Sequence, residues 1–229
     1  MGDGFITRRG GGATTGLPKF TYTGTFTLLD DGNKNWRIKF TTSGTLKFTK
    51  VSTVDIFLVG GGGGAANGAG GGGYTKTVKG IVPAVGTSYA VVVGAGGAKG
   101  SVDANAGAGG TSSALSQSVA GGKGGYGWNN ADGYGGAGGS GGGTYTSGAG
   151  GTNGGNGAVG GGGGSRAGGT GQGTTTGEFG VSTATIYSPG GKAGGSNNAG
   201  AAVKANIGAG GNGSHTAGGS GIVVIRNKR

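Results

Sequence analysis

The sequence predicts an all-β protein, in which an antiparallel β-sandwich scaffold emits long glycine-rich excursions that pack as polyglycine-II helices. Glycine supplies 70 of the 229 residues, and it disfavours a helix interior by about 1 kcal/mol per residue relative to alanine. Apolar residues nevertheless recur with the period of two that is typical of β-strands, before the glycine-rich part and at its far end. Collagen is excluded because the chain has only three prolines and its glycines do not follow a strict period of three.

Residues 1–19 are predicted to form a separate N-terminal docking arm. The segment contains one apolar pair followed by two arginines, a triglycine and a proline, which is too little apolar surface to fold alone. Such a terminus either becomes ordered on a partner or stays disordered. If it docks, the residues expected to contact the partner are Phe5, Ile6, Arg8 and Arg9.

Residues 20–59 are predicted to form a β meander. Apolar residues alternate with threonine and lysine through this segment, as in "WRIKF", and the sequence "DDGN" at 30–33 is a turn signal. The alternation places one row of side chains in a core and the other row in water. Trp36 is therefore expected to pack in the core or at its rim rather than to hold a ligand.

Residues 60–229 are predicted to form a glycine-rich β/polyglycine-II domain that closes with a strand at 220–226. Strand signals interrupt the glycines at 81–82, 87–94, 113–120 and 182–188, and their apolar side chains need a sheet to bury them. A flexible linker has no use for such residues. Polyglycine-II helices, with three residues per turn and no side chains, can pack at backbone distance, and their contacts offset the cost of ordering glycine.

Composition argues against several classes of function. The net charge is +11, but the basic residues are spread thinly, so no nucleic-acid partner is predicted. The chain has no cysteine, and its one histidine, His215, has no nearby carboxylate to orient it, so we expect no enzyme activity, no metal site and no cofactor. No apolar run approaches the length of a membrane span, which predicts no membrane insertion.

An aromatic cluster lies within the glycine-rich part, beside two asparagines and an aspartate. Exposed rings and amides at a loop tip suit the binding of sugars or peptide loops, because the ring offers apolar area and the amides offer directional hydrogen bonds. The alternative is that the rings clamp the glycine lattice by packing over its faces. The candidate binding residues are Tyr126, Trp128, Asn129, Asn130, Asp132, Tyr134 and Tyr145.

The succession of "FLVGGGGGAANGAGGGGY", "SYAVVVGAGGAKGS", "AGGKGG" and a closing "GGSGIVVIR" resembles the glycine-rich domain of many bacteriophage tail proteins and prophage-encoded surface proteins, over about residues 54–226. The sequence is more loosely similar to the polyglycine-II sandwich of T-even phage tail-fibre adhesins and to the glycine-rich region of certain receptor tyrosine kinase ectodomains. In those adhesins, distal loops between the glycine helices touch the host receptor. The resemblance therefore favours residues 126–145 as a receptor-binding region.

The resemblance implies a bacteriophage virion protein that is assembled in the host cytoplasm, acts outside the cell and binds other virion proteins through its N-terminal arm. The first hypothesis is a tail-tip or tail-fibre adhesin that binds a host cell-surface glycan or protein. The second is a capsid decoration or head-fibre structural protein without a specific receptor. A third is an ice-binding protein that uses the flat faces of bundled helices. A homotrimer would suit a fibre component, but no heptad or collagen segment specifies one.

Overall fold

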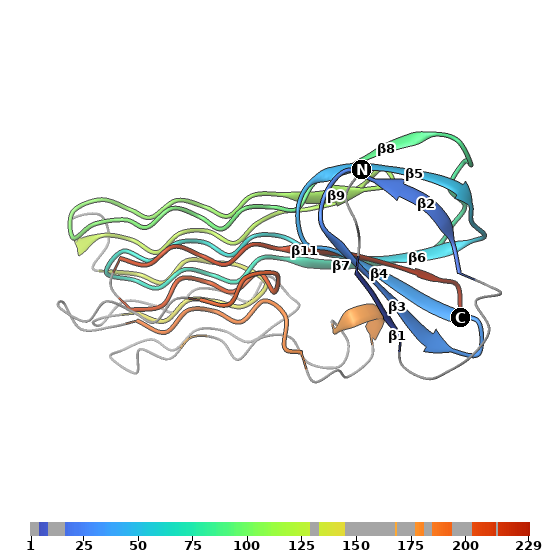
Figure 1. The fold of residues 1–229 in the computed structure, drawn as a ribbon. Helices are drawn as coiled ribbons and strands as arrows, with labels where there is room; N and C mark the ends of the chain where they lie inside the picture. Colours follow the sequence, from blue (N-terminus) through green and yellow to red (C-terminus); the bar gives the residue numbers. More distant parts are fainter. Residues whose placement is uncertain are drawn as a thin grey trace.

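The protein has two joined parts, a β-sandwich and a bundle of extended chains that projects from one end of it (Figure 1). The structure is a computed structural model, and it describes residues 5–8, 17–128, 133–144, 168, 177–180, 185–193, 203–213 and 215–229. The described residues contain β-strands and the 3₁₀ turn η2 (Glu178–Gly180), with no α-helix among them. The predicted all-β class is confirmed.

The larger sheet of the sandwich has six strands. The pairing within it is antiparallel except between its first two strands, which run parallel. In spatial order the strands are β1 (Phe5–Arg8), β3 (Phe26–Gly32), β4 (Asn35–Phe40), β11 (Ile222–Asn227), β6 (Val54–Val59) and β7 (Thr75–Ile81).

The smaller sheet has three antiparallel strands, and a short hairpin lies beside it. An isolated bridge between Val92 and Ser113 links this hairpin to the end of the smaller sheet. The strands of the smaller sheet are β2 (Lys19–Tyr22), β5 (Gly44–Lys50) and β8 (Ser88–Val91), and those of the hairpin are β9 (Ser112–Ala114) and β10 (Gln117–Val119).

The main core lies between the two sheets, and the period of two in the sequence fills it. Along β4, the side chains of Trp36, Ile38 and Phe40 are buried, and the residues between them are only partly buried. On β5, Leu46 and Phe48 face the same core while lysine and threonine alternate outwards. Trp36 is 2% exposed, which confirms it as a packing residue.

The strands of residues 20–59 divide between the two sheets instead of forming one continuous meander. Strands β3, β4 and β6 belong to the larger sheet, whereas β2 and β5 belong to the smaller one. The chain crosses from one sheet to the other at residues 41–43, after the buried Phe40. The pairing of β4 with β11, which comes almost two hundred residues later, explains this arrangement, because β11 occupies the place beside β4 that the next strand of a meander would take.

Three strands of the larger sheet continue without interruption into the bundle. Strand β6 runs into residues 60–66, residues 68–74 return into β7, and residues 216–221 lead into β11. Val59 pairs with Thr75 and Ile222, and the hydrogen bonds beyond it continue in the same register into the glycine runs. The sheet therefore sets the alignment of the bundle.

The backbone amides of the first glycine run, residues 60–66, point to three neighbouring chains in strict rotation and return to the same neighbour at every third residue. This is the pattern of polyglycine-II, whose helix has three residues per turn and no internal hydrogen bonds. The bonds, with N···O distances of 2.7–3.0 Å, run from Gly60 to Tyr74, Gly61 to Gly110, Gly62 to Gly219, Gly63 to Gly71, Gly64 to Gly107, Ala65 to Thr216 and Ala66 to Gly68.

The first run is enclosed on all sides by other chains. Its carbonyls accept hydrogen bonds from three further neighbours, for example from Gly122 to Gly61, from Gly97 to Gly62 and from Gly211 to Gly63. The run thus has six neighbours, as in a hexagonal lattice. The second run, residues 68–74, donates in the same rotation to residues 120–126, 140–143 and 208–211. The predicted polyglycine-II packing is confirmed for these runs.

The close approach of the chains explains why glycine occupies the centre of the bundle. A Cβ atom on Gly62 would lie 1.9 Å from the carbonyl oxygen of Ala209, and one on Gly70 would lie 2.0 Å from that of Gly63. On an outer run, side chains occur where the helix turns outwards, as at the exposed Ala95 and Ala98, which are one turn apart. The buried alanines of the first two runs, Ala65, Ala66 and Ala69, lie near the turn that joins these runs.

A second layer covers the outer face of the larger sheet at its central strands. Phe179 and Tyr187 pack on Phe57, with ring centroids 6.0 and 5.1 Å from it, and Arg226 lies 4.1 Å from the centroid of the Phe179 ring. Strands β6 and β11 are therefore buried on both faces, apart from the partly buried Asn227 at the end of β11. The sequence predicted a strand at 182–188, but residues 185–188 form none. The side chain of Tyr187 packs on Phe57, and the amide of the next residue, Ser188, donates to the carbonyl of Ile207, which belongs to no strand.

Glu178 fastens this layer to the sheet. Its carboxylate is 3% exposed and accepts hydrogen bonds from Arg37 at 2.7 Å, Lys39 at 2.9 Å and the hydroxyl of Tyr187 at 3.0 Å. Burial alone would raise the pKa of Glu178, but the positive charges and hydrogen bonds of Lys39 and Arg37 outweigh burial and lower it. The ionised form of Glu178 therefore holds two distant parts of the chain together.

Candidate functional site

The turns between the glycine runs meet at the end of the bundle that lies away from the sandwich, which we call the distal end (Figure 1). The first two runs join around residues 66–68, and residues 101–105 form the turn between the runs 94–100 and 106–110. The amide of Trp128 donates to the carbonyl of Val102 at 2.6 Å, and the amide of His215 donates to that of Ala66 at 3.3 Å. These bonds place four segments, far apart in the sequence, at one end of the molecule.

The turn at residues 101–105 is held by hydrogen bonds of its own. Ser101 and Ala104 exchange two of them, one from the amide of Ser101 to the carbonyl of Ala104 at 3.0 Å and one from the amide of Ala104 to the hydroxyl of Ser101 at 3.1 Å. The side chain of Asn105 accepts a bond from the amide of Gly127 at 3.0 Å. This turn and the segment at 127–128 therefore form one unit.

Two large apolar side chains are exposed on this unit. Trp128 is 43% exposed and Val102 is 48% exposed, and we call them the tip pair. Their backbones are joined directly, so the two side chains are presented from one fixed base. Asp103 on this turn and Lys99 at the end of the preceding run are both exposed, so charges of both signs lie close to Val102 in the sequence.

The structure brings together some of the predicted binding residues. Tyr126 and Tyr134 lie side by side, with the amide of Tyr126 donating to the carbonyl of Tyr134 at 2.9 Å, and both are half-buried. Trp128 is exposed beyond them. The other predicted residues, Asn129, Asn130, Asp132 and Tyr145, lie outside the described residues.

Two residues of the distal end were missed by the sequence prediction, Val102 and Asn105. Both lie in the sequence "GSVDANAG", where a single valine interrupts small and polar residues. That isolated valine was the feature of the sequence from which an exposed apolar residue on this turn could have been predicted. Its place beside Trp128 depends on the pairing of distant glycine runs, which composition does not specify.

The residues predicted for docking are divided by the structure. Phe5, Ile6 and Arg8 belong to β1, which runs parallel to β3 at the edge of the larger sheet, and Arg9 lies outside the described residues. A partner that binds this arm would therefore meet it at a sheet edge.

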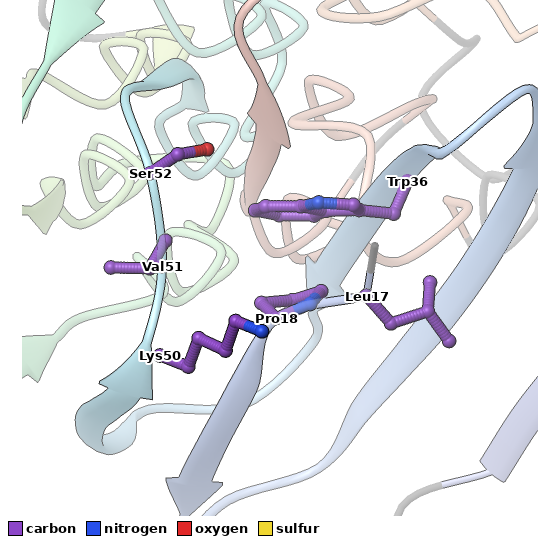
Figure 2. Close-up of a pocket in the computed structure, with 6 residues that line it drawn as sticks. All are labelled: Leu17, Pro18, Trp36, Lys50, Val51 and Ser52. Carbon is purple, nitrogen blue, oxygen red and sulfur yellow. The ribbon is translucent and has the colours of Figure 1, made fainter. Parts of the chain in front are cut away.

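A cleft opens at the end of the sandwich away from the bundle, which we call the base. It encloses about 160 Å³ between the start of β2, the start of β4 and the end of β5. Figure 2 shows the ring of Pro18 beneath the indole of Trp36, with Lys50 extending beside Pro18. The lining residues are Leu17, Pro18, Trp36, Lys50, Val51 and Ser52.

Among the described residues, no group of three or more His, Asp or Glu side chains has the arrangement of a metal site. In the same part of the chain, no helix has the length and apolar character needed to cross a membrane.

Comparison with known proteins gives one result on identity. No curated protein matches the chain. A family model described as a glycine-rich domain matches residues 41–228, which include the described runs of the bundle and most strands of the sandwich. The period-three lattice explains such a family signature, because a Cβ in the centre of the lattice would overlap a neighbouring carbonyl. The chain therefore belongs to the glycine-rich domain family.

Proposed function

We propose that the protein is a bacteriophage virion structural protein, a tail-tip or tail-fibre adhesin that binds a host cell-surface receptor through the distal end of its glycine-rich bundle. The observation that carries this proposal is the tip pair, Val102 and Trp128, exposed at the end of a projecting lattice. The seven residues of the first run give the bundle a length of about 20 Å at the rise of a polyproline II helix. A contact surface at the distal end would therefore project away from the virion proteins proposed to hold the sandwich.

The lattice supports receptor binding because it holds the tip in place before a ligand arrives. Ordering side chains and loops on binding costs free energy, and a surface that is already ordered avoids most of that cost. The turn at 101–105 and the segment at 127–128 are joined by two hydrogen bonds, from Trp128 to Val102 and from Gly127 to Asn105. An exposed indole and an exposed valine on one unit suit a sugar ring or an apolar side chain of a host protein.

The proposed partners at the other end of the molecule are further virion proteins. Residues 1–19 are proposed as the docking arm, with β1 giving it a fixed place along the edge of the larger sheet. The protein would then be assembled in the host cytoplasm and act on the virion outside the cell.

Replacing Trp128 by alanine is expected to weaken binding to host cells by at least about tenfold, because aromatic anchors carry a large share of interface energy. Val102→Ser should weaken it by about threefold, since it removes apolar contact from the same pair. The measurement is the binding of fluorescently labelled protein to host cells over a range of concentrations.

The matched control is Val82→Ser, because Val82 is also an exposed valine, 76% exposed, but lies beyond the end of β7 on the sandwich. This variant should bind host cells as well as the unmodified protein does. Undiminished binding by Trp128→Ala would remove the distal end as the receptor site.

A further inference from the structure

Exposed lysines gather at the base, and one of them lines the cleft. Lys50 lines it, and Lys19 pairs with Lys50 across β2 and β5. The amide of Lys228 donates to the carbonyl of Thr53, next to the lining residue Ser52, at 3.1 Å. All three lysines are exposed.

A fourth lysine lies at the same end. Asn227 accepts a hydrogen bond from the amide of Trp36 at 2.9 Å, and its side-chain nitrogen lies 3.5 Å from the carbonyl of Lys34. Lys34 is also exposed. Four exposed lysines therefore lie at the end of the sandwich that carries the cleft, and among the described residues no ion pair involves any of them.

Two of the three carboxylates near the cleft are engaged by arginines, and the third, Asp30, pairs in register with Trp36 and accepts a hydrogen bond from the amide of Gly32 at 2.9 Å. Asp31 is bound by Arg37, at 2.8 Å, and by Arg229. Asp55 is 1% exposed and pairs with Arg226 at 3.1 Å. Asp31 and Asp55 are neutralised by arginines, so of these three acids only Asp30 is left to oppose the charge of the four lysines.

The interior of the cleft is apolar. Its lining gives it an apolar floor with Lys50 at its edge, and Figure 2 shows the ring of Pro18 beneath the indole of Trp36. A volume of about 160 Å³ is well below the range of pockets that enclose small-molecule ligands. It has room for a single large apolar side chain.

We propose that the base is a docking surface for an acidic protein segment, which inserts one apolar side chain into the cleft while its carboxylates face Lys19, Lys34, Lys50 and Lys228. The charge of the base and the apolar cleft together select this partner. A nucleic acid would meet the lysines, but its phosphate backbone would leave the Pro18–Trp36 cleft unfilled. The inference concerns the end opposite to the proposed receptor site, and it stands whether or not the distal end binds a receptor.

The two tryptophans of the chain allow both ends to be observed at once, since Trp36 lines the base cleft and Trp128 belongs to the tip pair. The experiment uses the full chain labelled with ¹⁵N, and Trp128→Phe assigns the two indole signals. The probe is a synthetic peptide of ten residues with a central leucine flanked by glutamates. The comparison peptide has serine in place of that leucine.

The glutamate peptide is expected to shift the indole signal of Trp36 and the amide signal of Val51, and to leave Trp128 unmoved, with a dissociation constant of about 1 mM or tighter. The affinity should fall as salt is added, because the charges on both sides are exposed. The serine peptide should bind several-fold more weakly.

Lys50→Glu should weaken binding of the glutamate peptide by about tenfold, because it replaces attraction by repulsion at the edge of the cleft. Lys123→Glu is the matched control. Lys123 is an exposed lysine on the bundle, and its substitution changes the net charge by the same amount. It should change the affinity by less than about twofold.

Three results would overturn the proposal. The first is an unmoved Trp36 signal at about 1 mM peptide. The second is equal binding by the Lys50→Glu and Lys123→Glu variants. The third is a shift of the Trp36 indole signal by a short DNA duplex at a lower concentration than the peptide requires. That result would assign the base to nucleic acid.

Discussion

Replacing Gly62 by valine is expected to lower the free energy of unfolding by at least about 3 kcal/mol. A Cβ atom at this position would lie 1.9 Å from the carbonyl oxygen of Ala209 and 2.8 Å from the amide of Gly210. Both contacts are with backbone, so no side chain can rotate away to make room. The amide of Gly62 also donates to Gly219, so a displaced run loses hydrogen bonds on several sides.

The measurement for this variant is thermal unfolding by calorimetry, where a loss of this size corresponds to a Tm lower by roughly 10 °C. Ala95→Val is the matched control, because Ala95 is exposed on the surface of the bundle and the added methyl groups face water. It should shift Tm by no more than a degree or two. Equal Tm values for Gly62→Val and the unmodified protein would show that the glycine runs do not pack as a lattice.

Glu178→Gln is expected to lower the free energy of unfolding by about 3 kcal/mol. The substitution preserves size but removes the carboxylate that Lys39 pairs with and one of the two that Arg37 pairs with, since Arg37 keeps Asp31. It also weakens the hydrogen bond from the Tyr187 hydroxyl, because a neutral amide oxygen is a poorer acceptor than a carboxylate. Chemical denaturation gives the free energy directly.

A matched control is Asp30→Asn, since Asp30 accepts a local hydrogen bond from the amide of Gly32 and no ion pair among the described residues involves it. This substitution should lower the free energy of unfolding by less than about 1 kcal/mol. An effect of Glu178→Gln no larger than that of Asp30→Asn would contradict the role assigned to Glu178.

The same carboxylate sets the response of the protein to acid. The pKa of Glu178 is lower in the folded protein than in the unfolded chain, so its contribution is complete above the unfolded value and is lost as pH falls through the folded value. Asp31 follows the same rule: burial alone would raise its pKa, but hydrogen bonds from Arg37 and Arg229 lower it. The free energy of unfolding should therefore fall below about pH 5, and it should fall less steeply with pH in the Glu178→Gln variant than in the unmodified protein.

The sequence predicted those parts of the fold that depend on local pattern. The alternation around Trp36, Ile38 and Phe40 was enough to identify a half-buried strand. The glycine count, together with the strand at the far end, was enough to predict an ordered polyglycine-II lattice rather than a linker. In both cases the period of the backbone conformation is visible in the residues themselves.

The parts that failed depend on contacts between distant residues. The division of residues 20–59 between two sheets follows from the insertion of β11 beside β4, which no local pattern reveals. Tyr187 looked like a strand residue, but it packs on Phe57 and donates to Glu178. The candidate site shows the same limit. Trp128 could be proposed from the aromatic residues around it in the sequence, whereas Val102 joins the site only because its carbonyl accepts a hydrogen bond from the amide of Trp128.

The central claim is that the glycine runs form a rigid lattice that positions the distal end, and amide hydrogen exchange tests it most directly. The amides at residues 60–66 and 68–74 all donate to neighbouring chains. They should exchange at least about 10⁴-fold more slowly than amides in an unstructured chain, because opening them requires unfolding of the whole bundle. Exchange of these glycines at the rate of an unstructured chain would contradict the account.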